Sequence, residues 1–152
     1  MILPSPVGPL EIVSDGTAIT QISFATKKTK STGRETKHLG LLAKELAEYF
    51  AGKRTTFSVP LNAEGTPFQQ SVWRAMSKIP YGQTLSYGEI AKKIGKPNAL
   101  RAVGTACGKN PIVIVLPCHR VTAASGGIGG YSGGLPKKKI LLALERNATS
   151  KK

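Results

Sequence analysis

The spacing of hydrophobic residues predicts a small region of mixed strand and helix in the first sixty residues. Apolar and polar residues are interspersed over 10–13 and 19–24, as in half-buried strands. The Asp15-Gly16 pair between these segments suits a tight turn with positive φ, so we expect a β-hairpin. Residues 55–59 are a candidate further strand. A helix that ends at Gly52 is expected over residues 38–51, because four apolar side chains recur there at helical spacing: Leu39, Leu42, Leu46 and Phe50.

The pattern over residues 66–148 predicts mainly helices. Thr66 is a candidate N-cap and Pro67 a first helical residue, after a linker over 60–66. Ser86 and Glu89 form a capping box for a short helix that breaks at Gly95, and Asn98 is a candidate cap for a second helix, which ends at Gly108. Two short helices joined by a turn with glycine are typical of a helix-turn-helix. A last helix starts at Pro136 and carries an apolar stripe formed by Ile140, Leu141 and Leu144.

These patterns predict an α+β fold with two parts. Residues 1–62 are expected to form an N-terminal domain of β-hairpin or small sheet plus helix. Residues 66–148 are expected to form a helical C-terminal domain with a helix-turn-helix of winged-helix-like kind.

The second helix of the helix-turn-helix separates by face. Leu100, Val103 and Cys107 are spaced i, i+3 and i+7, which predicts that they form its buried side. Arg101 and Thr105 lie opposite, and Ala102 and Ala106 flank them. One arginine among small side chains permits a close approach to DNA but offers few groups that read base edges. The pattern therefore indicates DNA binding with little sequence readout.

The charge balance favours a polyanionic partner. The chain has 22 Lys and Arg against 8 Asp and Glu, and no acidic residue occurs from 90 to 144. A solvated basic surface is the alternative, but so long an acid-free stretch favours a nucleic-acid face. The N-terminal residues lack the features of a signal peptide and no apolar stretch approaches membrane-spanning length, so we expect a cytoplasmic, nucleoid-associated protein with no membrane partner.

The strongest chemical signal is Cys118. An apolar run from Ile112 to Leu116, expected to be a buried strand or extended segment, ends at Pro117 and delivers Cys118 beside His119 and Arg120. A thiol reacts as its thiolate, whose formation a neighbouring base or positive charge favours. The alternative is a cysteine that packs like a small aliphatic residue. Two cysteines at this spacing suggest neither a disulfide framework nor a zinc site, and we expect no metal and no cofactor.

A carboxylate in the last helix is the expected companion of this site. Glu145 lies near the Leu141 edge of the apolar stripe, so it is expected to be partly buried and to need a partner. His119 and Arg120 are the candidate partners. Tyr131 is the only large polar side chain in the Gly- and Ser-rich stretch 122–134 before this helix.

Together these segments resemble the O6-alkylguanine-DNA alkyltransferase family. The resemblance rests on Arg101-Ala102-Val103-Gly104, on Asn110-Pro111 through Pro117-Cys118-His119-Arg120-Val121, and on residues 129–135, Gly-Gly-Tyr-Ser-Gly-Gly-Leu. It implies direct DNA repair, in which the alkyl group of O6-alkylguanine in double-stranded DNA moves irreversibly to Cys118 in a single turnover. It leaves activity on O4-alkylthymine open. It also implies that the target nucleotide is flipped from the minor groove, since chemistry on a base requires its removal from the stack.

The resemblance implies a role for each matching residue. Arg101 would fill the gap left by the flipped nucleotide, and Tyr87 would help to rotate it outward. Ala102 and Thr105 would face DNA on the same helix. Asn110 would brace the helix-turn-helix against the active-site segment. Tyr131 would give a proton or hydrogen bond to the departing guanine, Ser132 would contact the base oxygen, and Glu145 would orient His119 in a Cys118–water–His119 relay. A monomer is expected.

Two other functions remain open at this point. A DNA-binding module without chemistry would share the scaffold and lack the reactive cysteine, whereas Cys118 is present here. A thiol hydrolase would use Cys118 and His119 but would not need a basic, acid-free helix-turn-helix.

Overall fold

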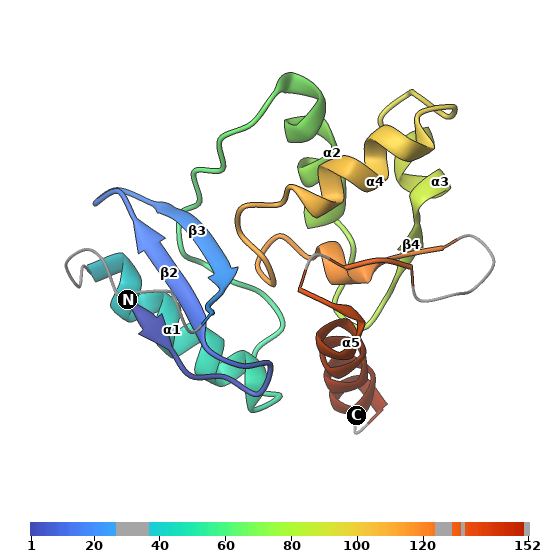
Figure 1. The fold of residues 1–152 in the computed structure, drawn as a ribbon. Helices are drawn as coiled ribbons and strands as arrows, with labels where there is room; N and C mark the ends of the chain where they lie inside the picture. Colours follow the sequence, from blue (N-terminus) through green and yellow to red (C-terminus); the bar gives the residue numbers. More distant parts are fainter. Residues whose placement is uncertain (27–36, 124–128, 132, 151–152) are drawn as a thin grey trace. The chain divides into compact units, whose positions relative to one another are not determined.

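The computed structural model describes residues 1–26, 37–123, 129–131 and 133–150 (Figure 1). The chain forms two compact units. The first comprises Met1–Glu64 with Pro111–Val113, and the second comprises Gly65–Asn110 with Ile114–Lys152.

The first unit contains a three-stranded antiparallel sheet in the order β1-β2-β3. Its strands are β1 (Ile2–Leu3), β2 (Leu10–Ser14) and β3 (Ile19–Phe24). The expected hairpin is confirmed: Ile12 pairs with Ile22, both are fully buried, and Gly16 has a φ of 97° in the turn between the strands. The Asp15 carboxylate accepts the N–H of Ala18 at 2.9 Å and completes this turn.

Helix α1 (Lys37–Phe50) packs against β2 in the first unit. Its buried side includes the predicted Leu39, Leu42 and Leu46. Tyr49, rather than Phe50, is the fully buried aromatic residue at the end of this side.

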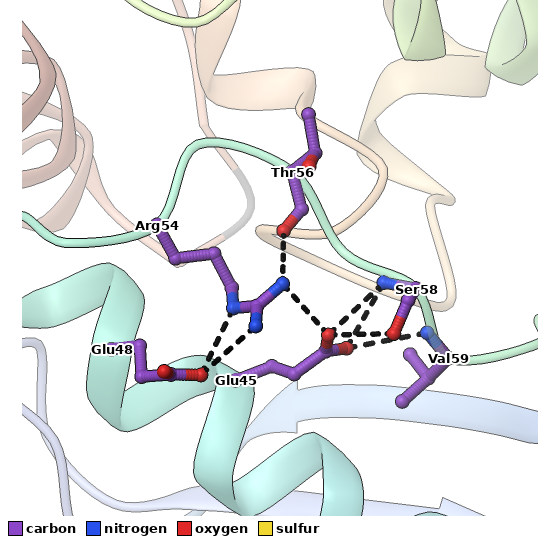
Figure 2. Close-up of polar contacts among 6 residues, drawn as sticks. All are labelled: Glu45, Glu48, Arg54, Thr56, Ser58 and Val59. Atoms are coloured by element: carbon purple, nitrogen blue, oxygen red, sulfur yellow. Dashed lines mark hydrogen bonds and ion pairs between the residues drawn. The ribbon is translucent and has the colours of Figure 1, made fainter.

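Glu45 on α1 is buried. Figure 2 shows that its carboxylate contacts the segment after the helix. Its carboxylate accepts hydrogen bonds from the backbone N–H groups of Ser58 at 3.1 Å and Val59 at 3.2 Å, and it pairs with Arg54 at 2.9 Å. Arg54 also reaches Glu48 at 3.0 Å. The prediction of a strand over 55–59 is wrong, because a side-chain carboxylate takes the backbone donors that a neighbouring strand would have used.

The apolar run before Cys118 is not one continuous strand. Ile22 in β3 donates its N–H to the Pro111 carbonyl at 2.9 Å and accepts from the Val113 N–H at 3.1 Å, which joins 111–113 to the first unit. The chain then turns at Ile114, a buried residue with a φ of 75°. Positive φ is strained for a β-branched residue, so surrounding contacts must hold this turn.

The second unit begins with the predicted helix caps. Helix α2 (Pro67–Ser77) starts with a capping box between Thr66 and Gln69, and α3 (Tyr87–Lys93) starts with one between Ser86 and Glu89. Trp73 of α2 is buried, and its indole N–H donates to the Ala106 carbonyl of α4 (Leu100–Gly108) at 2.9 Å. This bond and apolar packing join α2 to α4, and α3 also packs on α4.

Three details of α4 and of the last helix, α5 (Leu135–Ser150), differ from the sequence prediction. Asn98 does not cap α4, whose N-cap is Ala99 with no side-chain hydrogen bond. On α4, Leu100 is 51% exposed and Ala106 is buried, which reverses their predicted faces. On α5, Ile140 is 42% exposed, whereas Leu141 is fully buried as predicted.

The residues around Cys118 complete the second unit. A single turn of 3-10 helix, η1 (Cys118–Arg120), leads into β5 (Val121–Thr122), which pairs in parallel with β4 (Leu85–Ser86). Helix α5 packs against η1. Within the described parts of the chain, no helix has the length and apolar character needed to cross a membrane.

Candidate active site

A cavity of about 150 Å³ in the second unit brings both cysteines and two tyrosines together. Its lining comes from α3, α4, η1 and the residues before α5: Tyr87, Gly104, Cys107, Gly108, Cys118, Gly130 and Tyr131. The sequence places these residues in four separate stretches.

Cys118 is 4% exposed at the start of η1. Burial raises the pKa of the Cys118 thiol, while the Asn110 side chain, the charge of Lys138 and the Tyr131 hydroxyl act to lower it. Because burial dominates, the resting group is a protonated thiol, and a base must remove its proton before it attacks.

His119 and Glu145 form the buried hydrogen-bonded pair expected from the sequence. The His119 Nε2 lies 2.7 Å from the Glu145 Oε2, and both side chains are almost completely buried. Burial lowers the pKa of His119 and outweighs the opposite effect of Glu145, so the imidazole is neutral near neutral pH. With Nε2–H donated to Glu145, Nδ1 carries the lone pair, and Nδ1 has no hydrogen-bond partner among the described residues.

Arg120 holds the same carboxylate from the other side. Its Nε donates to the Glu145 Oε1 at 2.8 Å and its Nη2 to Oε2 at 3.0 Å, while Nη1 donates to the Ile79 carbonyl at 2.8 Å. The backbone N–H of Gly82 adds a fourth hydrogen bond to Glu145 at 3.2 Å. Burial alone would raise the pKa of Glu145, but His119 and Arg120 hold it at about 2. Glu145 is therefore a fixed anion that orients two neighbours.

Asn110 links the end of α4 to the segment that carries Cys118. Its Nδ2 donates to the Leu116 carbonyl at 2.7 Å, and its side chain also acts on the Cys118 thiol. The same residue thus closes the strained turn at Ile114 and contacts the Cys118 thiol.

Lys138 is a site residue that the sequence analysis missed. Its side chain is fully buried, and its Nζ donates to the carbonyls of Val121 at 2.6 Å and Gly130 at 2.8 Å. Burial lowers the pKa of Lys138, although the two thiols act to raise it. The sequence did contain a signal for this burial. Lys138, Leu141 and Glu145 are spaced i, i+3 and i+7, which places them on the same face of the helix.

The two tyrosines lie on the cavity wall. Burial raises the pKa of Tyr131, and the adjacent Cys118 raises it further, so its hydroxyl keeps a proton to donate. The hydroxyl of Tyr87 lies close to Gly129, where an added Cβ would stand 3.1 Å from it; Gly129 also has a φ of 74°. Glycine at 129 therefore leaves room for Tyr87 at the cavity.

Cys107 has a different environment from Cys118. It is 6% exposed, its Sγ lies 3.6 Å from the Met76 Sδ, and burial raises its pKa to about 12. The described contacts place no imidazole beside it, which fits a packing role.

The DNA-binding candidates on α4 point outward. Arg101, Ala102 and Thr105 are exposed on this helix. Ser132, the remaining candidate, lies outside the described residues.

The second unit contains 14 Lys and Arg against two acidic residues, Glu89 and the buried Glu145. The positive charge of the protein is concentrated in the unit that carries α4.

The family comparisons cover both units. A family model described as "6-O-methylguanine DNA methyltransferase, DNA binding domain" matches residues 67–147, and its "ribonuclease-like domain" counterpart matches residues 2–63. The chain is 46% identical over 150 residues to the methylated-DNA–protein-cysteine methyltransferase of Mycobacterium bovis, an alignment of 95% of this chain and 90% of the relative. It is 45% identical over 149 residues to the protein of that name from Methanosarcina acetivorans, with 95% and 96% covered.

Solved structures agree with the sequence comparisons. The crystal structure of Mycobacterium tuberculosis OGT in complex with DNA superposes with a TM-score of 0.90 at 44% identity, covering 97% of this chain and 92% of that chain. A Methanococcus jannaschii O6-methylguanine DNA methyltransferase superposes with a TM-score of 0.70 at 30% identity, with 96% and 93% covered.

Proposed function

This chain belongs to the 6-O-methylguanine DNA methyltransferase family, and we propose that it repairs DNA by transferring the methyl group of O6-methylguanine to Cys118. We assign the reaction to Cys118 because it lines the cavity and directly precedes His119, which forms a buried pair with Glu145. Cys107 lines the same cavity but has no such pair among the described contacts.

The transfer is a nucleophilic substitution at the methyl carbon. The Cys118 thiolate forms a carbon–sulfur bond while the carbon–O6 bond breaks, and the bonding electrons stay with the guanine. Tyr131 donates a proton to the departing base, because its own raised pKa keeps it protonated until negative charge develops nearby. The products are guanine in DNA and an S-methyl thioether, which water does not hydrolyse. Each molecule therefore acts once, and the reaction needs no cofactor and no metal.

His119 supplies the base that the buried thiol needs. Its Nδ1 accepts the Cys118 proton through a water molecule, and the resulting imidazolium is stabilised by the Glu145 carboxylate 2.7 Å from Nε2. Arg120 keeps that carboxylate ionised, and Lys138 adds positive charge beside the thiolate. Asn110 positions the segment that carries Cys118.

The chain binds DNA through its second unit, and we assign the target as double-stranded DNA with O6-alkylguanine in the minor groove. A flipped nucleotide is required because Cys118 is 4% exposed, and flipping costs a few kcal/mol. Arg101 fills the vacated space, Ala102 and Thr105 allow close approach, and Tyr87 and Ser132 contact the flipped nucleotide. O4-alkylthymine is a second substrate class to test.

The remaining assignments follow from this reaction. Residues 66–148 act as the DNA-binding and transfer domain and residues 1–62 as a structural domain. A single copy supplies every residue of the proposed site, which supports a monomer. Because the proposed substrate is DNA, we expect the protein to act at the nucleoid, in the cytoplasm.

The proposal is tested with three reagents: free O6-benzylguanine, a duplex with one O6-methylguanine, and the same duplex unmodified. We expect the protein mass to rise by one benzyl group with the first and one methyl group with the second, and to stay unchanged with the third. A protein that binds both duplexes but gains no mass is a DNA-binding module without chemistry.

Arg101→Ala is expected to separate base flipping from chemistry. Because Arg101 acts only when the base is stacked, its loss slows repair of methylated duplex at least about tenfold. Reaction with free O6-benzylguanine keeps its wild-type rate. Lys109→Ala, which removes an equal charge from the other end of α4, is the control and has a smaller effect on the duplex rate. An equal loss on both substrates for Arg101→Ala would place this residue in the general fold.

A further inference from the structure

Leu100 is an exposed apolar side chain at the start of α4. It is 51% exposed, the highest value among the large hydrophobic side chains that are exposed in the described residues. Its periodicity with Val103 predicts burial, yet Val103 is fully buried and Leu100 is not. Packing within the second unit therefore does not account for an apolar residue at this position.

The neighbours of Leu100 are the residues assigned to DNA. Arg101 and Ala102 follow it directly, and both are exposed. Its Cδ2 lies 3.7 Å from the position that a Cβ on Gly88 would take, and Gly88 follows Tyr87 at the start of α3. Leu100 thus lies between the start of α3 and the exposed face of α4.

Charge indicates what covers this side chain. Arg101 adjoins it on α4, Lys96 precedes it in the turn between α3 and α4, and both are exposed. The acid-free stretch from 90 to 144 includes all of α4. DNA fits this combination, because its phosphates attract the cations and its stacked bases offer an apolar surface to the leucine.

We propose that Leu100 is a wedge that enters the DNA between base pairs next to the flipped nucleotide. Aliphatic side chains that enter the minor groove partly unstack a base step and bend the duplex. Leu100 opens the step while Arg101 occupies the space that the nucleotide leaves. Its exposed surface is buried only in the DNA complex, so this contact favours the flipped state. This role rests on the proposed function.

The test compares Leu100→Ala and Leu100→Met with wild-type protein and with Leu41→Ala, which shortens a leucine that is 37% exposed on α1 in the first unit. Rates are measured on methylated duplex and on free O6-benzylguanine. A 2-aminopurine placed beside the lesion reports unstacking by its fluorescence.

We expect Leu100→Ala to slow repair of the duplex about three- to tenfold and to reduce the rise in 2-aminopurine fluorescence. Reaction with the free base stays at the wild-type rate, which also shows that the variant is folded. Leu100→Met retains the duplex rate because it keeps the apolar length, and Leu41→Ala matches wild type throughout. Equal duplex rates for Leu100→Ala and wild type would overturn the wedge. Failure of wild-type protein to react with either substrate would overturn the proposed function instead.

Discussion

Cys118→Ala is expected to abolish methyl transfer completely while leaving the affinity for duplex DNA close to that of wild type. The side chain is 4% exposed inside the cavity, so its loss removes the proposed nucleophile without altering the exposed face of α4. No other described group replaces it, because Cys107 has a pKa raised to about 12 and packs against Met76. The measurements are the rate of demethylation of a methylated duplex and binding of the unmodified duplex.

Cys107→Ala is the matched control. It removes a thiol from the same cavity and is expected to keep transfer, with some loss of thermal stability from the space left beside Met76. Residual transfer by Cys118→Ala, or loss of transfer by Cys107→Ala with the fold intact, would reverse the roles of the two thiols.

Glu145→Gln is expected to cost about 3–5 kcal/mol of folding free energy, because it leaves the buried Arg120 guanidinium without its carboxylate. The same change removes the group that orients His119, so transfer slows at neutral pH and the pH–rate profile moves to higher pH. Chemical denaturation and single-turnover rates across pH measure the two effects. Glu64→Gln, an exposed carboxylate in the first unit, is the control and stays near wild type in both.

Acid is expected to destabilise the wild-type protein in two steps. The pKa of His119 is lowered on folding, so the unfolded chain binds its proton first and stability falls as the pH drops below about 6.5. The pKa of Glu145 is lowered to about 2, so its contribution is complete above its usual range and is lost between about pH 4.5 and 2. The second step is absent in Glu145→Gln. An unchanged denaturation midpoint and pH–rate profile in this variant would remove Glu145 from both roles.

Local signals in the sequence predicted the helix starts of the second unit and the hairpin of the first. The capping boxes at Thr66 and Ser86 involve residues three apart, and the Asp15-Gly16 turn is equally local, so neither depends on distant parts of the chain. The pairing of Glu145 with His119 and Arg120 was also predicted, because a carboxylate on an apolar stripe needs a partner.

Contacts between distant segments explain what the sequence did not reveal. Residues 55–59 look like a strand, but Glu45 on α1 takes their backbone donors. The run before Cys118 looks continuous, but Ile112 pairs with Ile22 and the chain then turns at Ile114. The basic run at 137–139 is typical of an exposed surface. Lys138 in this run is nevertheless buried, because its Nζ donates to the carbonyls of Val121 and Gly130.

We propose that Cys118 accepts one alkyl group and that the protein is then inactive. The direct measurement is a titration of wild-type protein with excess duplex containing O6-methylguanine, followed by mass spectrometry of the intact protein and of its peptides. We predict a plateau at one methyl group per protein, located on Cys118, with one guanine restored for each protein molecule. A methyl group on Cys107, or more guanines restored than protein molecules present, would rule out single-turnover transfer to Cys118.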